Sequence, residues 1–185
     1  MIKDALSEAN SRMSGAVRAL EEDLGAIRTG RASPALAEKI MVDYYGTPTP
    51  LIQLATISAP EPRLLTIRPF DPASIKDIER GILSSDLGLT PNNDGKIIRL
   101  SIPALTEDRR HELVKLVKAR MEEARVSVRN VRRDVHNDMR EFEGEKLVSE
   151  DELHRGEEDL QKVTDEIIEQ INAVGERKER EVLEV

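Results

Sequence analysis

The chain has 185 residues, of which 35% are charged and only 2% aromatic, and its formal net charge is -8. It contains no cysteine, which excludes disulfides, thiol nucleophiles and zinc thiolate sites. The first residues lack the apolar run of a signal peptide, and no segment approaches the roughly 20 apolar residues that span a bilayer, so we expect a cytoplasmic protein without membrane association.

The first segment places apolar residues at steps of three and four, which predicts an amphipathic helix from Ile2 to about Thr29. Gly30 can supply a left-handed helix end, and Pro34 prevents the helix from continuing. The apolar positions are Leu6, Ala9, Met13, Ala16, Leu20 and Ile27.

The middle segment, residues 31–104, holds all nine prolines and several short β-rich runs. One helix interrupts the strands; it is capped by Asp71, with Pro72 at its first position, and is expected to end near Gly88. The pattern predicts a small β/α/β domain, a short barrel or sandwich. The predicted strands cover residues 40–45, 51–57, 64–68 and 96–102.

Two more helices follow. One begins with Thr106 as its N-cap, runs to about Phe142 and ends near Gly144. The other opens on a capping box of Ser149 and Glu152, and its apolar residues recur every seven positions. Three long amphipathic helices can bury their apolar faces only against each other, so we expect an α+β protein built on an elongated antiparallel three-helix bundle.

The bundle is complete only when the first helix packs on the other two, so residues 1–30 and 105–185 are predicted to form one domain, with residues 31–104 inserted into it. Two short connections tether the insertion and make a natural hinge. The hinge residues are Gly30, Arg31, Ala32, Ser33 and Pro34 on one connection, and Ile102, Pro103, Ala104, Leu105 and Thr106 on the other.

The most informative run is ARVSVRNVRR, residues 124–133, with four arginines and no acid in an acidic chain. Arg125, Arg129 and Arg132 are spaced to share one helix face, beside a valine-rich seam. Because guanidinium groups fork onto phosphate oxygens, this face predicts a nucleic-acid backbone as partner. The alternative is a solvated flank with Glu partners. No acid lies between Glu123 and Asp134, so pairing at four-residue spacing cannot neutralise the middle of the run.

Catalytic motifs are nearly absent. The three histidines do not have metal-ligand spacing, and the sequence has no phosphate loop or Gly-x-Ser-x-Gly motif. We therefore expect no enzyme, no cofactor and no metal. Tyr44 and Tyr45 could stack on bases, but alternation along a strand explains the pair better. Two rival classes remain: a helical scaffold, which would oligomerise through unpaired apolar positions, and a nucleotide-dependent enzyme, which would need a phosphate cradle.

Five runs, in this order along essentially the whole chain, resemble the ribosome recycling factor family. They are IRTGRASP at 27–34, YYGTPTPL at 44–51, SDLGLTPNNDG at 85–95, LTEDRR at 105–110 and VSVRNVRRD at 126–134. The resemblance implies an L-shaped protein in which a three-helix bundle carries an inserted β/α/β domain on a flexible elbow. One departure is Asp108, where the family pattern has glutamate.

The same resemblance implies a role after translation termination: with elongation factor G and GTP, the factor would split the ribosome into subunits, as a monomeric wedge rather than an enzyme. It implies that Arg132, with Arg129 and Arg133 beside it, contacts large-subunit rRNA. Arg28 and Arg31, in the IRTGR run, would serve the same surface. Arg125 joins these candidates through its place on the basic face.

Overall fold

The structure is a computed structural model, and it describes residues 1–184. It divides into two compact units, a bundle unit of Met1–Arg28 with Glu107–Glu184 and an inserted unit of Thr29–Thr106. The predicted boundaries at 30/31 and 104/105 each differ from these by two residues. Within the described residues, no helix is both long enough and apolar enough to cross a membrane.

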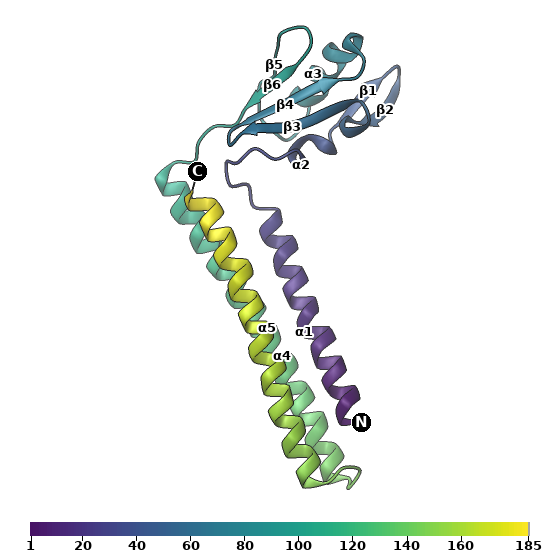
Figure 1. The fold of residues 1–185 in the computed structure, drawn as a ribbon, viewed down its shortest axis with the longest axis vertical. Coiled ribbons are helices and arrows are strands. Elements are labelled where there is room, and N and C mark those ends of the chain that lie inside the picture. The colour runs from purple at the N-terminus through teal and green to yellow at the C-terminus, as the bar shows by residue number, and fades with distance from the viewer. Residues whose placement is uncertain (185) are drawn as a thin grey trace. The chain divides into compact units, whose positions relative to one another are not determined.

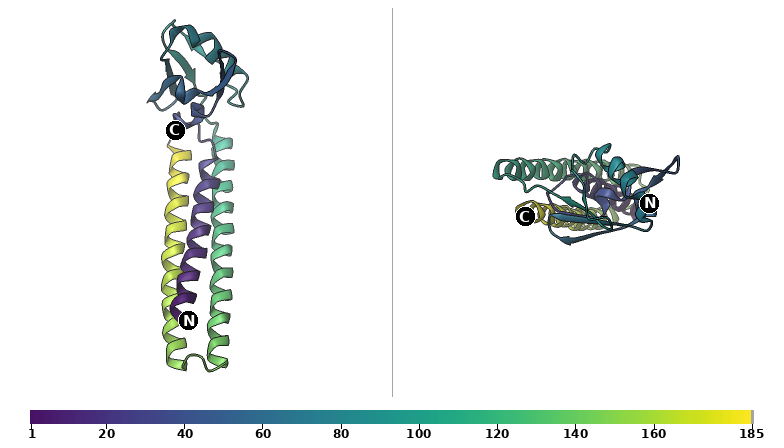
Figure 2. Two further views of the ribbon diagram at one scale, coloured as in Figure 1. Left: turned by 90° about the vertical axis from the view of Figure 1, so that its right-hand side faces the viewer. Right: turned by 90° about the horizontal axis from the view of Figure 1, so that it is seen from above.

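The bundle unit consists of three long helices, α1 (Ile2–Gly25), α4 (Glu107–Gly144) and α5 (Glu150–Leu183). In Figure 1, α1 and α5 run in one direction and α4 in the other. Figure 2 shows α1 lying against both partners, and all three pairs of helices are in contact. The predicted three-helix bundle is confirmed.

The bundle core is a line of side chains from the three apolar faces. On α4 the buried face begins at Leu113, and the adjacent Val114 is half-buried. On α5 two glycines are buried in the same line: a Cβ at Gly175 would lie 2.1 Å from Sδ of Met121. Close approach of α5 to α4 therefore depends on the missing side chain. The buried residues of α4 are Leu113, Val117, Met121, Ala124, Val128, Val131, Val135 and Met139.

Two predicted helix ends can be compared with the structure. The first helix ends at Gly25, about four residues earlier than predicted, because the amide of Ile27 bonds the carbonyl of Leu24 and closes a tight final turn. Gly30 does adopt a left-handed φ of 71°, but in the connecting segment. The capping box of α5 is confirmed: Ser149 N donates to Glu152 Oε2 at 2.8 Å, and Glu152 N to Ser149 Oγ at 3.3 Å.

The inserted unit holds two separate antiparallel sheets with helical turns between them. A hairpin pairs β1 (Met41–Tyr44) with β2 (Thr47–Pro50), and a four-stranded sheet has the order β3-β4-β6-β5. Among the described residues the larger sheet is open, with β3 and β5 at its edges, and is not a closed barrel. The strands are β3 (Ala55–Glu61), β4 (Leu64–Pro69), β5 (Asn92–Asn93) and β6 (Ile98–Ser101); the helices are α2 (Ala35–Glu38), η1 (Leu51–Gln53), η2 (Pro72–Ser74) and α3 (Ile75–Leu83).

Several local predictions for the inserted unit need correction. The predicted strand at 51–57 begins as the 3-10 turn η1. Strand β2 was not predicted, because two of its four residues are prolines, which disfavour strands. The predicted helix forms as two elements, the 3-10 turn η2, which Asp71 caps, and α3. Helix α3 ends at Leu83 rather than near Gly88, since the hydroxyl of Ser85 bonds the carbonyl of Ile82. The Asp71 cap itself is confirmed, with Oδ1 accepting from Ala73 N at 3.0 Å.

The tyrosine pair stands at the β1–β2 turn. Tyr44 packs against the core of the inserted unit, whereas Tyr45 is 80% exposed and adopts a left-handed φ of 49°. One ring is therefore in and the other out, as expected. The turn, rather than alternation along a strand, separates them. The core of this unit contains Ala37, Val42, Leu51, Leu54, Ala55, Leu65, Ile67, Ile75, Ile78, Ile82, Ile98 and Leu100.

Candidate nucleic-acid interface

The four arginines of the run, which we call the arginine stripe (Arg125, Arg129, Arg132 and Arg133), all lie on α4 in the bundle unit. Arg125 and Arg132 flank the buried seam on the side of α5, and both reach side chains of that helix. Arg129 and Arg133 are rotated further from the seam, toward solvent. The helix thus packs with one face and presents guanidinium groups on the next.

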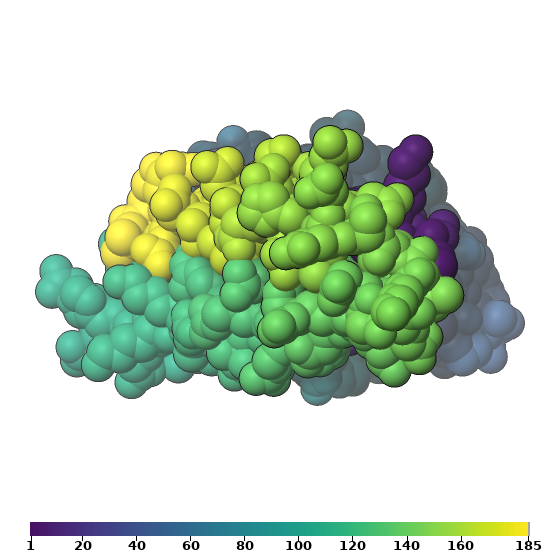
Figure 3. Space-filling view, turned by 90° about the horizontal axis from the view of Figure 1, so that it is seen from below, coloured from purple at the N-terminus to yellow at the C-terminus, as the bar shows by residue number. Residues whose placement is uncertain are grey.

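A groove runs beside the stripe where α4 and α5 lie against each other, and Figure 3 shows the two helices from this side. Its floor is largely apolar, with Leu160 buried and Ile168 half-buried. The hydroxyl of Thr164 bonds the carbonyl of Leu160 at 2.7 Å, so the floor offers no unsatisfied donor there. The lining residues are Arg129, Arg132, Arg133, His136, Glu157, Leu160, Gln161, Thr164 and Ile168.

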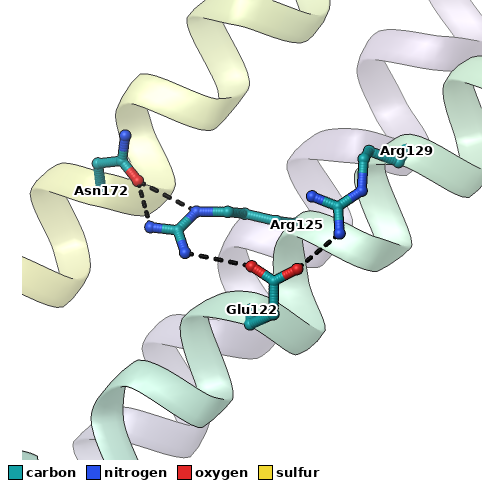
Figure 4. Close-up of polar contacts among 4 residues, drawn as sticks. All are labelled: Glu122, Arg125, Arg129 and Asn172. Atoms are coloured by element: carbon teal, nitrogen blue, oxygen red, sulfur yellow. Dashed lines mark hydrogen bonds and ion pairs between the residues drawn. The ribbon is translucent and has the colours of Figure 1, made fainter.

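Half of the stripe is tied to one carboxylate, as Figure 4 shows. Nη2 of Arg129 donates to Oε1 of Glu122 at 2.6 Å, and Nη1 of Arg125 to Oε2 of the same residue at 3.4 Å. Hydrogen bonding from Arg129, and then from Arg125, holds the pKa of Glu122 below its usual range. Arg125 also reaches across to α5, with Nε and Nη2 donating to Oδ1 of Asn172 at 3.3 and 2.6 Å.

The other half of the stripe keeps its full positive charge. Nη1 of Arg132 donates to Oε1 of Gln161 at 2.5 Å, and Nη2 of Arg133 donates to Oδ1 of Asn130 at 3.0 Å. Both partners are neutral amides. Within residues 1–184, neither arginine forms an ion pair with an acid. These amides orient the guanidinium groups without cancelling their charge, which suits the capture of phosphate oxygens.

Pairing at four-residue spacing does not neutralise the middle of the run, as the sequence predicts, but Arg129 pairs with an acid at another spacing. Its partner Glu122 stands seven positions before it. Seven residues make nearly two full turns, so the two side chains lie only roughly 20° apart around the helix. An acid at seven-residue spacing can be found in the sequence, so this pair could have been predicted. The neutral partners on α5 had no such signal, because they depend on how the two helices are rotated against each other.

Histidine and acid pairs extend the polar network without forming a metal site. Nε2 of His136 lies 2.9 Å from Oε1 of Glu157 across the groove, and Nε2 of His154 lies 3.4 Å from Oε1 of Glu158 along α5. In the part of the chain that the structure describes, no three His, Cys, Asp or Glu side chains gather closely enough to hold a metal ion.

The two arginines of the IRTGR run lie outside the stripe, and they belong to different units. Arg28 follows α1 at the end of the bundle where α4 begins, while Arg132 lies 25 residues further along α4, about 38 Å away by helical rise. Arg31 is exposed and belongs to the inserted unit. The six predicted arginines therefore fall into a compact set on α4 and two separate residues.

The predicted hinge contains residues that belong to the fold of the inserted unit. The amide of Ala32 donates to the carbonyl of Pro62 at 2.7 Å, and that of Ile102 to the carbonyl of Arg63 at 2.9 Å. Both bonds end on the turn between β3 and β4. Pro34 caps α2. The residues of the two connections that lie outside these bonds are Gly30 and Arg31, and Pro103, Ala104, Leu105 and Thr106.

Comparison with known proteins gives a consistent assignment. The family model described as "Ribosome recycling factor" matches residues 20–183. Ribosome-recycling factors of Geobacillus sp. (strain WCH70) and Halalkalibacterium halodurans are 54% and 55% identical over 185 residues, covering all of both chains.

Solved structures agree with this result. A solution structure of the ribosome recycling factor is 44% identical with a TM-score of 0.77, covering 100% of this chain and 98% of that one. Models of the T. thermophilus ribosome recycling factor and the E. coli elongation factor G, bound to the E. coli post-termination complex, give 43% identity, 99% coverage of both chains and a TM-score of 0.64. With a family match across most of its length and full-length relatives above half identity, the chain belongs to the ribosome recycling factor family.

Proposed function

We propose that this chain binds the post-termination ribosome and, with elongation factor G and GTP, promotes its dissociation into subunits. The family is one of translation factors and not of enzymes. A factor without a catalytic centre can still drive disassembly when its bound position competes with contacts between the subunits and a GTPase supplies the free energy. The observation that carries the proposal is the arginine stripe, a basic face on a rigid helix in an otherwise acidic protein.

The ligand of the stripe is rRNA of the large subunit. Arg132 and Arg133 carry the proposal furthest, because their partners in the free protein are neutral and their charge is available to phosphate. Arg129 must leave Glu122 to contribute fully, and Arg125 is held by two partners. Arg28 would make a separate contact, since it follows α1 at the end of the bundle where α4 begins, and Arg31 would make its own contact from the inserted unit.

The inserted unit would move on its two connections while the bundle stays on rRNA. Because Ala32 and Ile102 are bonded to the β3–β4 turn, the pivot should lie outside them, at Gly30 and Arg31 on one side and Pro103 to Thr106 on the other. Bending there breaks none of the sheet hydrogen bonds. Elongation factor G could then displace one unit relative to the other.

The chain would act as a monomer in the cytoplasm. A helical scaffold needs an apolar seam left open for a partner, but in the bundle the seam residues of α1, α4 and α5 pack on one another. Val128 and Ile171, for example, are fully buried within the chain itself. Sedimentation equilibrium of the pure protein at micromolar concentration tests this directly, with a mass near 20.8 kDa as the expected result.

The test of the stripe is co-sedimentation with ribosomes and with separated large subunits. Arg132→Ala should weaken binding by about 1–3 kcal/mol while leaving the melting temperature unchanged, because the side chain lies off the packing seam. Arg120→Ala is the matched control: it removes the same charge from α4, but Arg120 lies roughly 120° from Arg132 around the helix and pairs with Glu123. Equal losses for the two variants would refute the assignment of the stripe.

A second test of the proposed function measures the splitting of ribosomes into subunits. Light scattering should fall when the protein is added to post-termination ribosomes together with elongation factor G and GTP, and should stay constant when either is omitted. The Arg132→Ala variant should require a higher protein concentration for the same rate. Binding without any splitting activity would contradict the proposed function and leave the rRNA contact intact.

A further inference from the structure

The carboxylate of Glu122 occupies the position that a phosphate would take on Arg129. Its Oε1 accepts from Nη2 of Arg129 at 2.6 Å, the shortest ion pair of the stripe. Both side chains are about half exposed, 54% for Glu122 and 52% for Arg129. An exposed ion pair of this kind contributes little to folding. Its effect should therefore be sought in binding rather than in stability.

The position of Glu122 on α4 is specific to the stripe. It lies roughly 20° from Arg129 around the helix, whereas the adjacent Glu123 lies roughly 120° away and pairs with Arg120. The chain therefore places one acid on the basic face and its neighbour on another face. This pair of glutamates offers an internal comparison, since both have the same charge on the same helix.

The two arginines bonded to Glu122 are held to different degrees. Arg125 is 27% exposed and uses all three of its nitrogens, two on Asn172 and one on Glu122. Within residues 1–184, Arg129 uses a single nitrogen, on Glu122, and forms no other hydrogen bond. Arg125 is a fixed link between α4 and α5, whereas Arg129 can exchange its partner for another anion.

We propose that Glu122 is an internal competitor for the guanidinium of Arg129, which an rRNA phosphate must displace before that arginine can bind. This inference rests on the proposed function, because it assigns a role to one residue of the same rRNA-binding face. In the free protein the carboxylate keeps Arg129 extended along α4 and ready for exchange. In the bound state it stands beside the phosphate and repels it.

Because of Glu122, the arginine stripe binds rRNA with a lower affinity than its four arginines alone would give. A factor that must leave the ribosome after each round benefits from faster dissociation. The competitor also discriminates among polyanions, because only a phosphate placed close to Arg129 recovers what is lost on leaving Glu122. A stripe without Glu122 would hold any RNA backbone more tightly, so the selectivity for ribosomes over other RNA should fall.

The experiment measures dissociation constants for large ribosomal subunits and for an unrelated RNA duplex of 20 base pairs. Glu122→Gln keeps the shape and removes the charge, and it should tighten binding to large subunits about two- to fivefold. Glu123→Gln is the matched control and should give less than half of that gain. The duplex should gain at least as much as the subunits in Glu122→Gln. Melting temperatures of both variants should equal that of the parent chain.

A double-mutant cycle distinguishes displacement of Glu122 from Arg129 from a general repulsion between the Glu122 charge and RNA. In an Arg129→Gln background the competitor has nothing to compete for, so Glu122→Gln should no longer tighten binding. If the gain persists in that background, or if Glu123→Gln produces the same gain, Glu122 acts only through long-range repulsion and the inference is overturned. No tightening in Glu122→Gln also overturns it. If the parent chain fails to bind large subunits at all, the proposed function falls together with it.

Discussion

Helices α4 and α5 lie side by side along the groove but have opposite compositions. Residues 105–140 carry 10 basic and 7 acidic side chains, and residues 141–185 carry 6 and 16. Such a pair would be expected to neutralise itself. It does not, because α5 presents the neutral amides Gln161 and Asn172 to the arginines, and Glu157 meets His136. The net charge of a helix therefore does not reveal which charges face its neighbour.

The largest effect is expected from a substitution that disrupts the close packing of α5 on α4. A Cβ at Gly175 of α5 would lie within 2.6 Å of Cγ, Sδ and Cε of Met121 on α4. Gly175→Leu should lower the free energy of unfolding by about 3 kcal/mol, since the side chain has no space at the core of the bundle. The measurement is denaturant unfolding followed by far-ultraviolet circular dichroism.

Gly15 provides the matched control for that substitution. It also lies within a helix, but a Cβ there would meet only Nη2 of Arg18, at 3.9 Å. Gly15→Leu should leave stability unchanged or raise it by up to about 1 kcal/mol, because leucine favours helix more than glycine does. Equal destabilisation of the two variants would mean that helix contact is not what Gly175 provides.

The contrast between α4 and α5 also shows what the sequence could predict. Both helices and the Ser149–Glu152 capping box follow from local rules, periodicity and side-chain caps, so they were predicted correctly. The strand β2 was not, because its prolines oppose the strand and pairing with β1 overrides that preference. The amide partners of the stripe depend on the rotation of α5 about its axis, which the packing of buried residues sets and which no local pattern reports.

The neutrality of α5 at the groove can be tested by adding one charge. Gln161→Glu places a carboxylate within reach of Arg132, and we expect it to weaken binding to large ribosomal subunits by about 1 kcal/mol because the arginine must then leave an ion pair. Folding stability should change little, since the new charge also stands four residues from Asp165, which Gln161 now bonds. Equilibrium co-sedimentation gives the affinity.

Gln170→Glu is the control for that change. It adds the same charge to α5 nine residues further on, which is roughly 180° around the helix and away from the groove. It should leave the affinity for large subunits within the error of the measurement at physiological salt, where exposed charges more than a Debye length apart are screened. If the two variants weaken binding equally, the overall acidity of α5 controls binding, and the facing residues have no special role.

The smallest effect concerns Arg125, the most enclosed member of the stripe. Asn172→Asp should strengthen its link across the two helices by about 0.5 kcal/mol, as a partly exposed ion pair replaces a neutral hydrogen bond. Binding to large subunits should change less than twofold, because Arg125 is already committed within the protein. Thermal unfolding and co-sedimentation measure the two quantities on one sample. Should Asn172→Asp weaken binding as much as Gln161→Glu, Arg125 would have to leave Asn172 in the complex, and it would be an RNA contact rather than the link that orients α4 against α5.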